Sequence, residues 1–139
     1  MTNKRLFLID GNSFCYRAYY AIRVLTNSKG QPTNAIYGFV AMLTKLIKEE
    51  KPDYLGVAFD LKGPTFRHKK FEEYKITRKP MPDDLISQMP LIKEVLGAYN
   101  IPIFEKAGYE ADDVLATIAR EAESNSIDTF IVTGDKTDH

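Results

Sequence analysis

The sequence is poor in the residues that build disulfides and soft-metal sites. It has one cysteine, Cys15, and two histidines, His68 and His139, among 139 residues. A single cysteine excludes an internal disulfide and a thiolate metal cluster, and it is typical of a reducing compartment. We therefore expect a cytoplasmic protein in which Cys15 is a small buried side chain.

An excess of charge of one sign and a long apolar run are also absent. Nineteen lysine and arginine residues balance nineteen aspartate and glutamate residues, so any surface that binds nucleic acid must be a local patch. The longest stretch without a charged residue runs from Gly30 to Thr44, whereas a transmembrane helix needs about 20 apolar residues. We expect neither a membrane span nor a signal peptide, and the length favours a single domain.

Short apolar runs alternate with helical patterns along the chain. Four runs rich in branched side chains predict buried strands at residues 5–9, 54–59, 101–104 and 129–132. Apolar residues at helical spacing predict a helix that Thr33 caps and that ends before Pro52. They also predict a helix from Pro82 to about residue 99, with a break near Met89, and another from Glu110 to about residue 124. This order favours an α/β fold with a mainly parallel sheet and helices on both faces.

Aspartates follow three of the four predicted strands, and acidic residues open the last predicted helix. Because parallel strands end at one edge of a sheet, where ligands gather, we expect six carboxylates to lie together there: Asp10, Asp60, Glu110, Asp112, Asp113 and Asp135. Their mutual repulsion requires raised pKa values or bound cations, and we favour cations. Ligands that are all oxygen select Mg²⁺ or Mn²⁺, and two such ions about 4 Å apart would support phosphodiester hydrolysis.

Each of these acidic residues also has a purely structural explanation. Acidic side chains in the first turn of a helix complement the helix dipole, and a single aspartate after a strand is usually a turn residue. The coincidence of three strand-end aspartates with an acidic helix start is what favours a metal site.

Residues 62–79 form a basic segment with interspersed aromatic residues. Seven lysines and arginines stand there against two glutamates, together with Phe66, Phe71 and Tyr74. Cations pair with phosphates, and aromatic rings stack on unpaired bases, as single-stranded nucleic acid requires. Since the segment follows Asp60 directly, we expect it to overhang the carboxylate edge. The alternative is a solvated surface helix whose aromatic rings face the core.

Five motifs occur together: Leu-Ile-Asp10-Gly-Asn-Ser, Phe-Asp60-Leu-Lys-Gly-Pro, Tyr74-Lys75-Ile-Thr-Arg78, Gly-Tyr-Glu110-Ala-Asp112-Asp113 and Val-Thr-Gly-Asp135-Lys. They closely resemble the 5′ nuclease domains of bacterial DNA polymerase I, in the flap endonuclease family with its PIN-like fold. The resemblance implies a two-metal 5′-3′ exonuclease and flap endonuclease, using Mg²⁺ or Mn²⁺, that removes RNA primers and 5′ flaps of DNA. It also implies that residues 1–139 are the N-terminal part of such a domain, with a basic helical arch at about 62–82, and that a polymerase domain belongs to the full-length protein.

The same resemblance implies roles for individual residues. Asp10, Asp60, Glu110 and Asp112 correspond to ligands of the first metal or their water-mediated partners, and Asp113 and Asp135 lie toward the second ion. Lys75 and Arg78 correspond to the catalytic basic pair at the scissile phosphate. Arg17 and Arg67 correspond to further phosphate contacts, Tyr16 to an aromatic residue that stacks on the terminal base, and Tyr74 and Lys79 to the same DNA-binding set.

Two departures from the family pattern leave an alternative open. Thr137 stands where the family has the second aspartate of Gly-Asp-Lys-Asp, and Asp138 lies one residue later. The helix-hairpin-helix element with which the family grips duplex DNA has no counterpart in this sequence. The alternative is therefore a catalytically weak or silent DNA-binding fragment. A phosphohydrolase of small substrates is a third hypothesis, against which the basic segment argues.

Overall fold

The computed structural model describes residues 3–60, 81–105, 111–133 and 137–138. Within these ranges, β1 (Lys4–Asp10), β2 (Tyr54–Ala58), β3 (Ile103–Phe104), β4 (Ile127–Val132) and β5 (Thr137–Asp138) form one sheet in the order β3-β2-β1-β4-β5. β1 lies at its centre, parallel to both β2 and β4, and β3 is parallel to β2. The mainly parallel sheet predicted from the sequence is confirmed.

The two edges of the sheet differ from the prediction in detail. β3 covers two of the four residues predicted, because Pro102 has no N–H to donate to a neighbouring strand. The Pro102 carbonyl nevertheless accepts a hydrogen bond of 3.0 Å from the Val57 N–H. At the other edge, β5 pairs antiparallel with β4. The sequence pattern did not predict β5, because two residues are too few to show an alternation.

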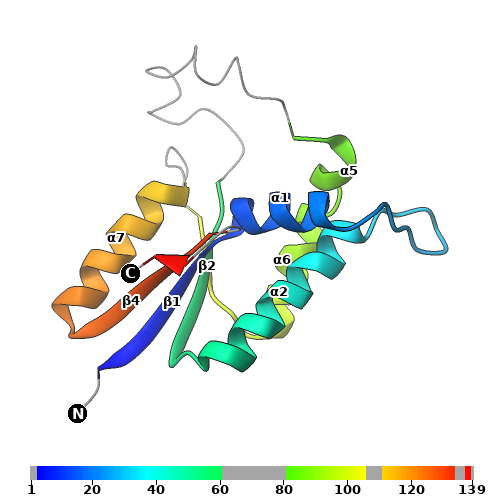
Figure 1. Ribbon diagram of the computed structural model, residues 1–139. Helices are drawn as coiled ribbons and strands as arrows, with labels where there is room; N and C mark the ends of the chain where they lie inside the picture. The colour runs from blue at the N-terminus through cyan, green and yellow to red at the C-terminus, as the bar shows by residue number, and fades with distance from the viewer. Residues whose placement is uncertain (1–2, 61–80, 106–110, 134–136, 139) are drawn as a thin grey trace, which may run out of the picture.

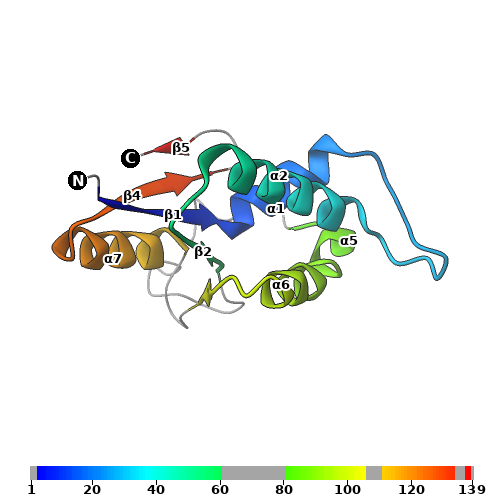
Figure 2. The same ribbon diagram turned by 90° about the horizontal axis from the view of Figure 1, so that it is seen from below.

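Helices cover both faces of the sheet (Figures 1 and 2). α1 (Gly11–Ala21), α2 (Asn34–Glu50) and α6 (Met89–Ala98) lie on one face, and α7 (Ala111–Ser124) lies on the other. The buried side chains of β1 alternate accordingly: Phe7 and Ile9 belong to the larger core, and Leu8 packs in the core that includes Leu115 of α7. A strand covered on both faces is apolar at successive positions. Such continuous apolar runs are the pattern from which the strands were predicted.

The helix predicted from Pro82 to residue 99 is divided, as expected. A short helix, α5 (Asp83–Ile86), precedes α6 (Met89–Ala98), and Pro90 lies in the first turn of α6. A proline there removes no hydrogen bond, because N–H groups of the first turn have no partner within the helix.

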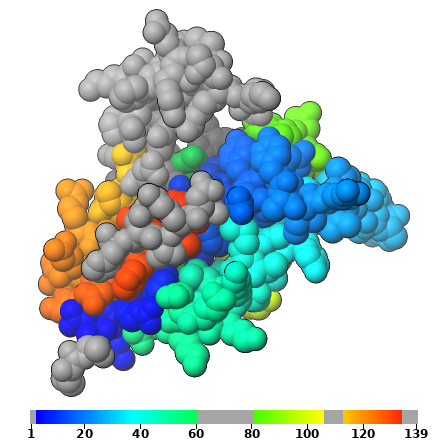
Figure 3. Space-filling model, in the orientation of Figure 1, coloured from blue at the N-terminus to red at the C-terminus, as the bar shows by residue number. Residues whose placement is uncertain are grey.

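The start of α2 confirms the position predicted for Thr33 but shows no capping hydrogen bond from its side chain. Thr33 occupies the N-cap position of α2, but its side chain makes no capping hydrogen bond. Instead, Oε1 of Gln88 accepts hydrogen bonds from the main-chain N–H groups of Ala35, at 2.8 Å, and Ile36, at 3.0 Å. A side chain between α5 and α6 therefore caps α2. The loop between α1 and α2, residues 22–33, extends away from the body (Figures 1 and 3).

Among the helices in the described part of the chain, none combines the length and the apolar character required to cross a membrane.

Candidate functional site

Asp10 stands where a strand passes directly into a helix. It is the last residue of β1 and the N-cap of α1, and its Oδ1 accepts a hydrogen bond of 3.2 Å from the Ser13 N–H. Because the N-terminus of a helix carries a partial positive charge, it stabilises a carboxylate. The strand-to-helix junction therefore places the Asp10 carboxyl group at the carboxyl edge of the sheet.

Asp60 lies at the same edge, just beyond the neighbouring strand. Asp10 is in register with Ala58, the last residue of β2, and the strands are parallel. The Asp60 main-chain N–H donates a hydrogen bond of 2.9 Å to Oδ1 of Asn12, in the first turn of α1. The predicted juxtaposition of Asp10 and Asp60 at the ends of adjacent strands is thus present, and Asn12 connects the two positions.

Glycine at position 11 permits this close approach. A Cβ atom on Gly11 would lie 2.6 Å from the Phe59 ring and 2.8 Å from the Ala58 carbonyl oxygen. Phe59 is fully buried, and its N–H donates to the Phe104 carbonyl at 3.0 Å. The start of α1 therefore rests directly on the end of β2, with no room for a larger residue.

The first turn of α7 lies at the same end of the sheet as the carboxyl ends of β1 and β2 (Figure 1). It contains Asp112 and Asp113, as predicted, and the side chain of Asp113 is half-buried. The Asp113 carbonyl accepts a hydrogen bond of 3.0 Å from the Thr117 hydroxyl. The topology thus directs a third acidic element toward the edge that carries Asp10 and Asp60.

Several predicted site residues lie outside the described residues: Arg67, Tyr74, Lys75, Arg78, Lys79, Glu110 and Asp135. Within the described ranges, no group of three or more histidine, cysteine, aspartate or glutamate side chains is arranged to hold a metal ion. The described geometry therefore contains the Asp10–Asp60 pair, and the predicted six-carboxylate cluster remains a prediction.

The donor chemistry of this pair fits a hard divalent cation. Asp10 and Asp60 offer carboxylate oxygens, the ligands that Mg²⁺ and Mn²⁺ prefer. Cys15, the soft donor on α1, is fully buried as expected, and burial raises the pKa of its thiol to about 12. Because a thiol binds metal as the thiolate, Cys15 contributes no ligand at neutral pH.

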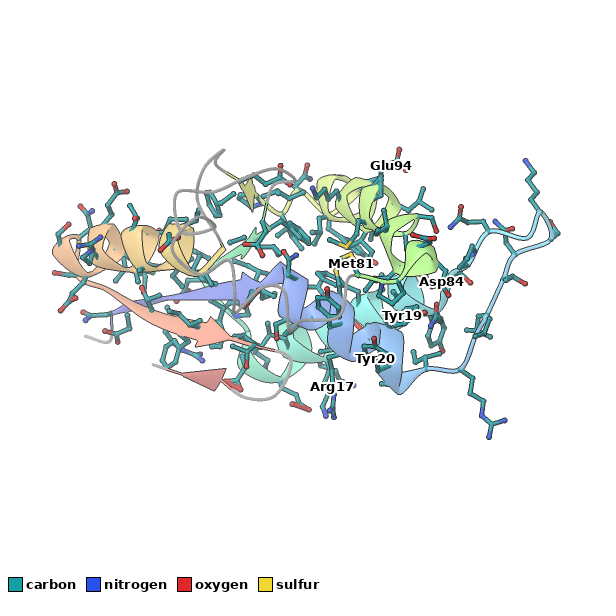
Figure 4. All side chains as sticks on the ribbon, turned by 90° about the horizontal axis from the view of Figure 1, so that it is seen from above. Arg17, Tyr19, Tyr20, Met81, Asp84 and Glu94 are labelled. Atoms are coloured by element: carbon teal, nitrogen blue, oxygen red, sulfur yellow. The ribbon has the colours of Figure 1, made fainter. Side chains whose placement is uncertain are left out.

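Tyr16 and Arg17 point in different directions from α1. Tyr16 is half-buried and packs against the larger core. Arg17 is exposed, and it lines a groove of about 430 Å³ between α1 and α2, together with Val132 and Thr133 at the carboxyl end of β4. Figure 4 shows Arg17 projecting on the side of α1 away from α5. Tyr16 and Arg17 were both predicted to contact DNA. Arg17 is the more exposed of the two, and its guanidinium is the kind of group that binds a phosphate.

Sequence reasoning missed Asn12 and a further strand-end carboxylate, Glu105. Glu105 directly follows β3 and forms an ion pair with Lys93 of α6. The Lys93 Nζ also lies 5.1 Å from the centroid of the Phe59 ring, beneath the end of β2. Its position in the sequence could have identified Glu105, because it directly follows the predicted strand 101–104, as Asp10 directly follows the predicted strand 5–9. Its charge is compensated within the protein by Lys93.

Comparison with protein families and curated proteins adds independent findings. Residues 5–138 match the family model described as 5′-3′ exonuclease, N-terminal resolvase-like domain. The chain is 50% identical over 132 residues to DNA polymerase I of Caldicellulosiruptor bescii, covering 95% of this chain and 16% of that protein. It is 47% identical over 133 residues to a 5′-3′ exonuclease of Aquifex aeolicus, covering 96% of this chain and 46% of that protein. The chain spans less than half the length of both relatives.

Solved structures show the same fold. A bacteriophage T5 protein co-crystallised with metal ions matches with a TM-score of 0.62 and 21% identity, covering 98% of this chain and 58% of that one. The T5 5′-exonuclease with bound zinc matches with a TM-score of 0.60 and 18% identity, over the same shares of the two chains. The predicted α/β, PIN-like architecture is confirmed by these likenesses.

Proposed function

Because the chain belongs to the family of 5′-3′ exonuclease N-terminal domains, we propose that it is a divalent-metal-dependent hydrolase of phosphodiesters at 5′ ends and 5′ single-stranded flaps of DNA. Its similarity to DNA polymerase I supports the further proposal that a polymerase domain accompanies it in the natural protein. Removal of RNA primers and flaps is the corresponding biological role.

The observation that carries this proposal is the placement of Asp10 and Asp60 at the carboxyl ends of adjacent parallel strands. A divalent cation held there would supply a water of lowered pKa and would neutralise charge on the phosphodiester. We propose that these two residues hold the first ion together with acidic residues of the last helix and the loop before it, and that the second ion lies toward the end of β4. The proposed metal ligands are Asp10, Asp60, Glu110, Asp112, Asp113 and Asp135.

The basic and aromatic residues complete the proposal. Lys75 and Arg78 are proposed to act on the scissile phosphate, because paired cations stabilise the charge that develops there. Arg17 is proposed to bind a neighbouring phosphate, which its exposed position on α1 favours. The full proposed DNA-binding set is Tyr16, Arg17, Arg67, Tyr74, Lys75, Arg78 and Lys79.

The test separates metal binding from the structural role of Asp10. Asparagine caps a helix as well as aspartate does, so Asp10→Asn preserves the α1 cap while removing the charge. We expect this variant to lose cleavage of a 5′-flap DNA in Mn²⁺ by at least about 100-fold, and to bind Mn²⁺ more weakly by calorimetry. Asp53→Asn is the matched control, because Asp53 also accepts a main-chain N–H, that of Arg5 at 2.8 Å. It lies at the opposite end of the sheet, and its activity should equal that of the wild type.

The possible outcomes distinguish the hypotheses. Cleavage that persists in EDTA, or that Asp10→Asn leaves unchanged, contradicts the proposed metal site. A wild-type protein that binds 5′-overhang DNA in a salt-dependent manner but hydrolyses none in Mn²⁺ supports the alternative of a catalytically silent DNA-binding fragment.

A further inference from the structure

An ion pair between α6 and the residue after β3 lies against the end of β2. Nζ of Lys93, on α6, pairs with Oε1 of Glu105, which directly follows β3. The two side chains are 32% and 24% exposed, and Oε1 of Glu105 is itself buried. The same Nζ lies 5.1 Å from the centroid of the Phe59 ring, within the range of a cation–π interaction. Lys93 therefore connects Glu105 with the residue that precedes Asp60.

β3 depends on such contacts because it is short. It pairs with β2 over two residues, Ile103 and Phe104, at one edge of the described sheet. The Phe104 carbonyl accepts a hydrogen bond of 3.0 Å from the Phe59 N–H, so the ends of β2 and β3 are joined directly. A segment with few hydrogen bonds opens readily, and the ion pair at Glu105 keeps the end of β3 in place against α6.

Phe59 connects these contacts with the carboxylate edge. Its ring is fully buried and also approaches α1, because a Cβ at position 11 would lie 2.6 Å from it. The next N–H along the chain, that of Asp60, donates to Oδ1 of Asn12 at 2.9 Å. A ring in contact with both Lys93 and the first turn of α1 has little room to move. A displacement of this ring shifts the adjoining main chain, which carries the Asp60 carboxylate.

The charge of Lys93 also acts near this edge. Burial raises the pKa of the Cys15 thiol to about 12, whereas the charge of Lys93 lowers it and that of Asp10 raises it. Lys93 and Asp10 therefore both lie within electrostatic reach of one buried point on α1. By itself, the Lys93 ammonium would repel a divalent cation held by Asp10 and Asp60, and its pairing with Glu105 offsets this repulsion.

We propose that Lys93 and Glu105 are positioning residues for metal binding, which fix the Phe59–Asp60 end of β2 beside Asp10. The inference rests on the proposed function, and it adds two residues that are not among the proposed metal ligands. They act through the Phe59 ring and the main chain of β3. Loss of the contacts at Lys93 lets Asp60 occupy more positions, and the ion then binds more weakly because its ligands are less preorganised.

Lys93→Met tests this role, because methionine keeps much of the length of lysine and removes the charge. We expect the Kd for Mn²⁺, measured by calorimetry, to rise by about 3- to 10-fold. Lys93→Arg retains a cation for both contacts and should stay within about 2-fold of the wild type. Lys48→Met is the matched control, since Lys48 is exposed in the last turn of α2, and it should leave the Kd unchanged.

The direction of the change separates positioning from simple electrostatics. Lys93→Met removes a positive charge near the proposed metal site, which by itself would strengthen Mn²⁺ binding. Weaker binding supports positioning, whereas stronger or unchanged binding overturns it, as does a lower melting temperature with no change in the Kd.

Glu105→Gln breaks the same ion pair and should also raise the Kd. Added to Lys93→Met, it should change the Kd by less than about 2-fold, because the effects of two partners in one contact are not additive. Fully additive effects would show that the two residues act separately, and would overturn the role of the pair.

Amide hydrogen exchange, followed by NMR, reports on the same end of β2 without metal. We expect the N–H groups of Phe59 and Asp60 to exchange faster in Lys93→Met than in Lys48→Met. Equal exchange in the two variants overturns the positioning role. Wild-type protein that binds no Mn²⁺ contradicts the proposed function instead, and the exchange rates then decide whether Lys93 and Glu105 position Asp60.

Discussion

Gly11 lies so close to Phe59 that a Cβ on the glycine would sit 2.6 Å from the phenylalanine ring. The ring is fully buried and cannot swing into solvent to make room. The Ala58 carbonyl oxygen, 2.8 Å from the same point, belongs to the main chain of β2. The absence of a side chain at position 11 is therefore a condition for the approach of the Asp10 and Asp60 positions.

Gly11→Ala tests this close contact. We expect a loss of about 1–3 kcal/mol in the free energy of unfolding, because overpacking forces the neighbours apart, and weaker Mn²⁺ binding by calorimetry. Gly97→Ala is the control, since a Cβ at that position in α6 would meet no atom within 4 Å apart from its chain neighbours and its own helix backbone. It should leave stability unchanged or raise it by up to about 1 kcal/mol. Equal effects of the two substitutions in urea unfolding would show that the contact is unimportant.

Gln88→Ala tests the capping of the α2 N-terminus by the Gln88 side chain. Its removal leaves the main-chain N–H groups of Ala35 and Ile36 and the side-chain Oδ1 of Asn34 without their partner. We expect the free energy of unfolding to fall by about 2–4 kcal/mol, measured by urea denaturation. Gln31→Ala, whose amide donates to the Pro32 carbonyl and the Ser87 hydroxyl nearer the surface, should lose less than about 1 kcal/mol. A comparable loss in both variants would contradict the role of Gln88.

The Tyr19 hydroxyl is expected to ionise only at high pH. Its hydrogen bond to the Asp84 carboxylate raises the pKa of Tyr19 from 10.0 to about 12. Because the neutral hydroxyl is the donor, its contribution to stability is complete below about pH 10 and is lost as the pH rises through about 12. Absorbance titration should show that Tyr19→Phe removes a tyrosine ionising near pH 12, whereas Tyr37→Phe leaves that ionisation in place. Loss of a tyrosine that titrates near pH 10 in Tyr19→Phe would refute the hydrogen bond in solution.

Cys15 should be unreactive in the folded protein. Burial raises the pKa of its thiol to about 12, and the nucleophilic form is the thiolate. Iodoacetamide at about pH 8 should leave the folded protein unmodified over the time in which it alkylates the urea-unfolded chain fully, as followed by mass spectrometry. Alkylation of the folded protein at the rate of the unfolded chain would indicate that Cys15 is accessible.

The strands and the longer helices could be predicted because burial leaves a local pattern. β1 is apolar at successive positions, since Phe7 and Leu8 face different cores, and α2 carries its apolar residues at helical spacing. The placement of Asp10 and Asp60 at one edge followed from the parallel order of the strands. Thr33 occupies the predicted N-cap position, but the side chain that caps α2 is that of Gln88, 53 residues from Ala35 in the sequence.

The sequence by itself determined the α/β class, the parallel sheet and the chemistry of the candidate site, because periodicity and residue type act over a few neighbouring positions. Only the tertiary structure decided which polar side chains hold those parts together. Asn12 meets residue 60 across 48 positions, and Tyr19 meets Asp84 across 65. Such pairs produce no periodic pattern in the sequence, because the two residues become neighbours only when the chain folds. Which polar groups pair is then decided by the need of buried polar groups for hydrogen-bond partners.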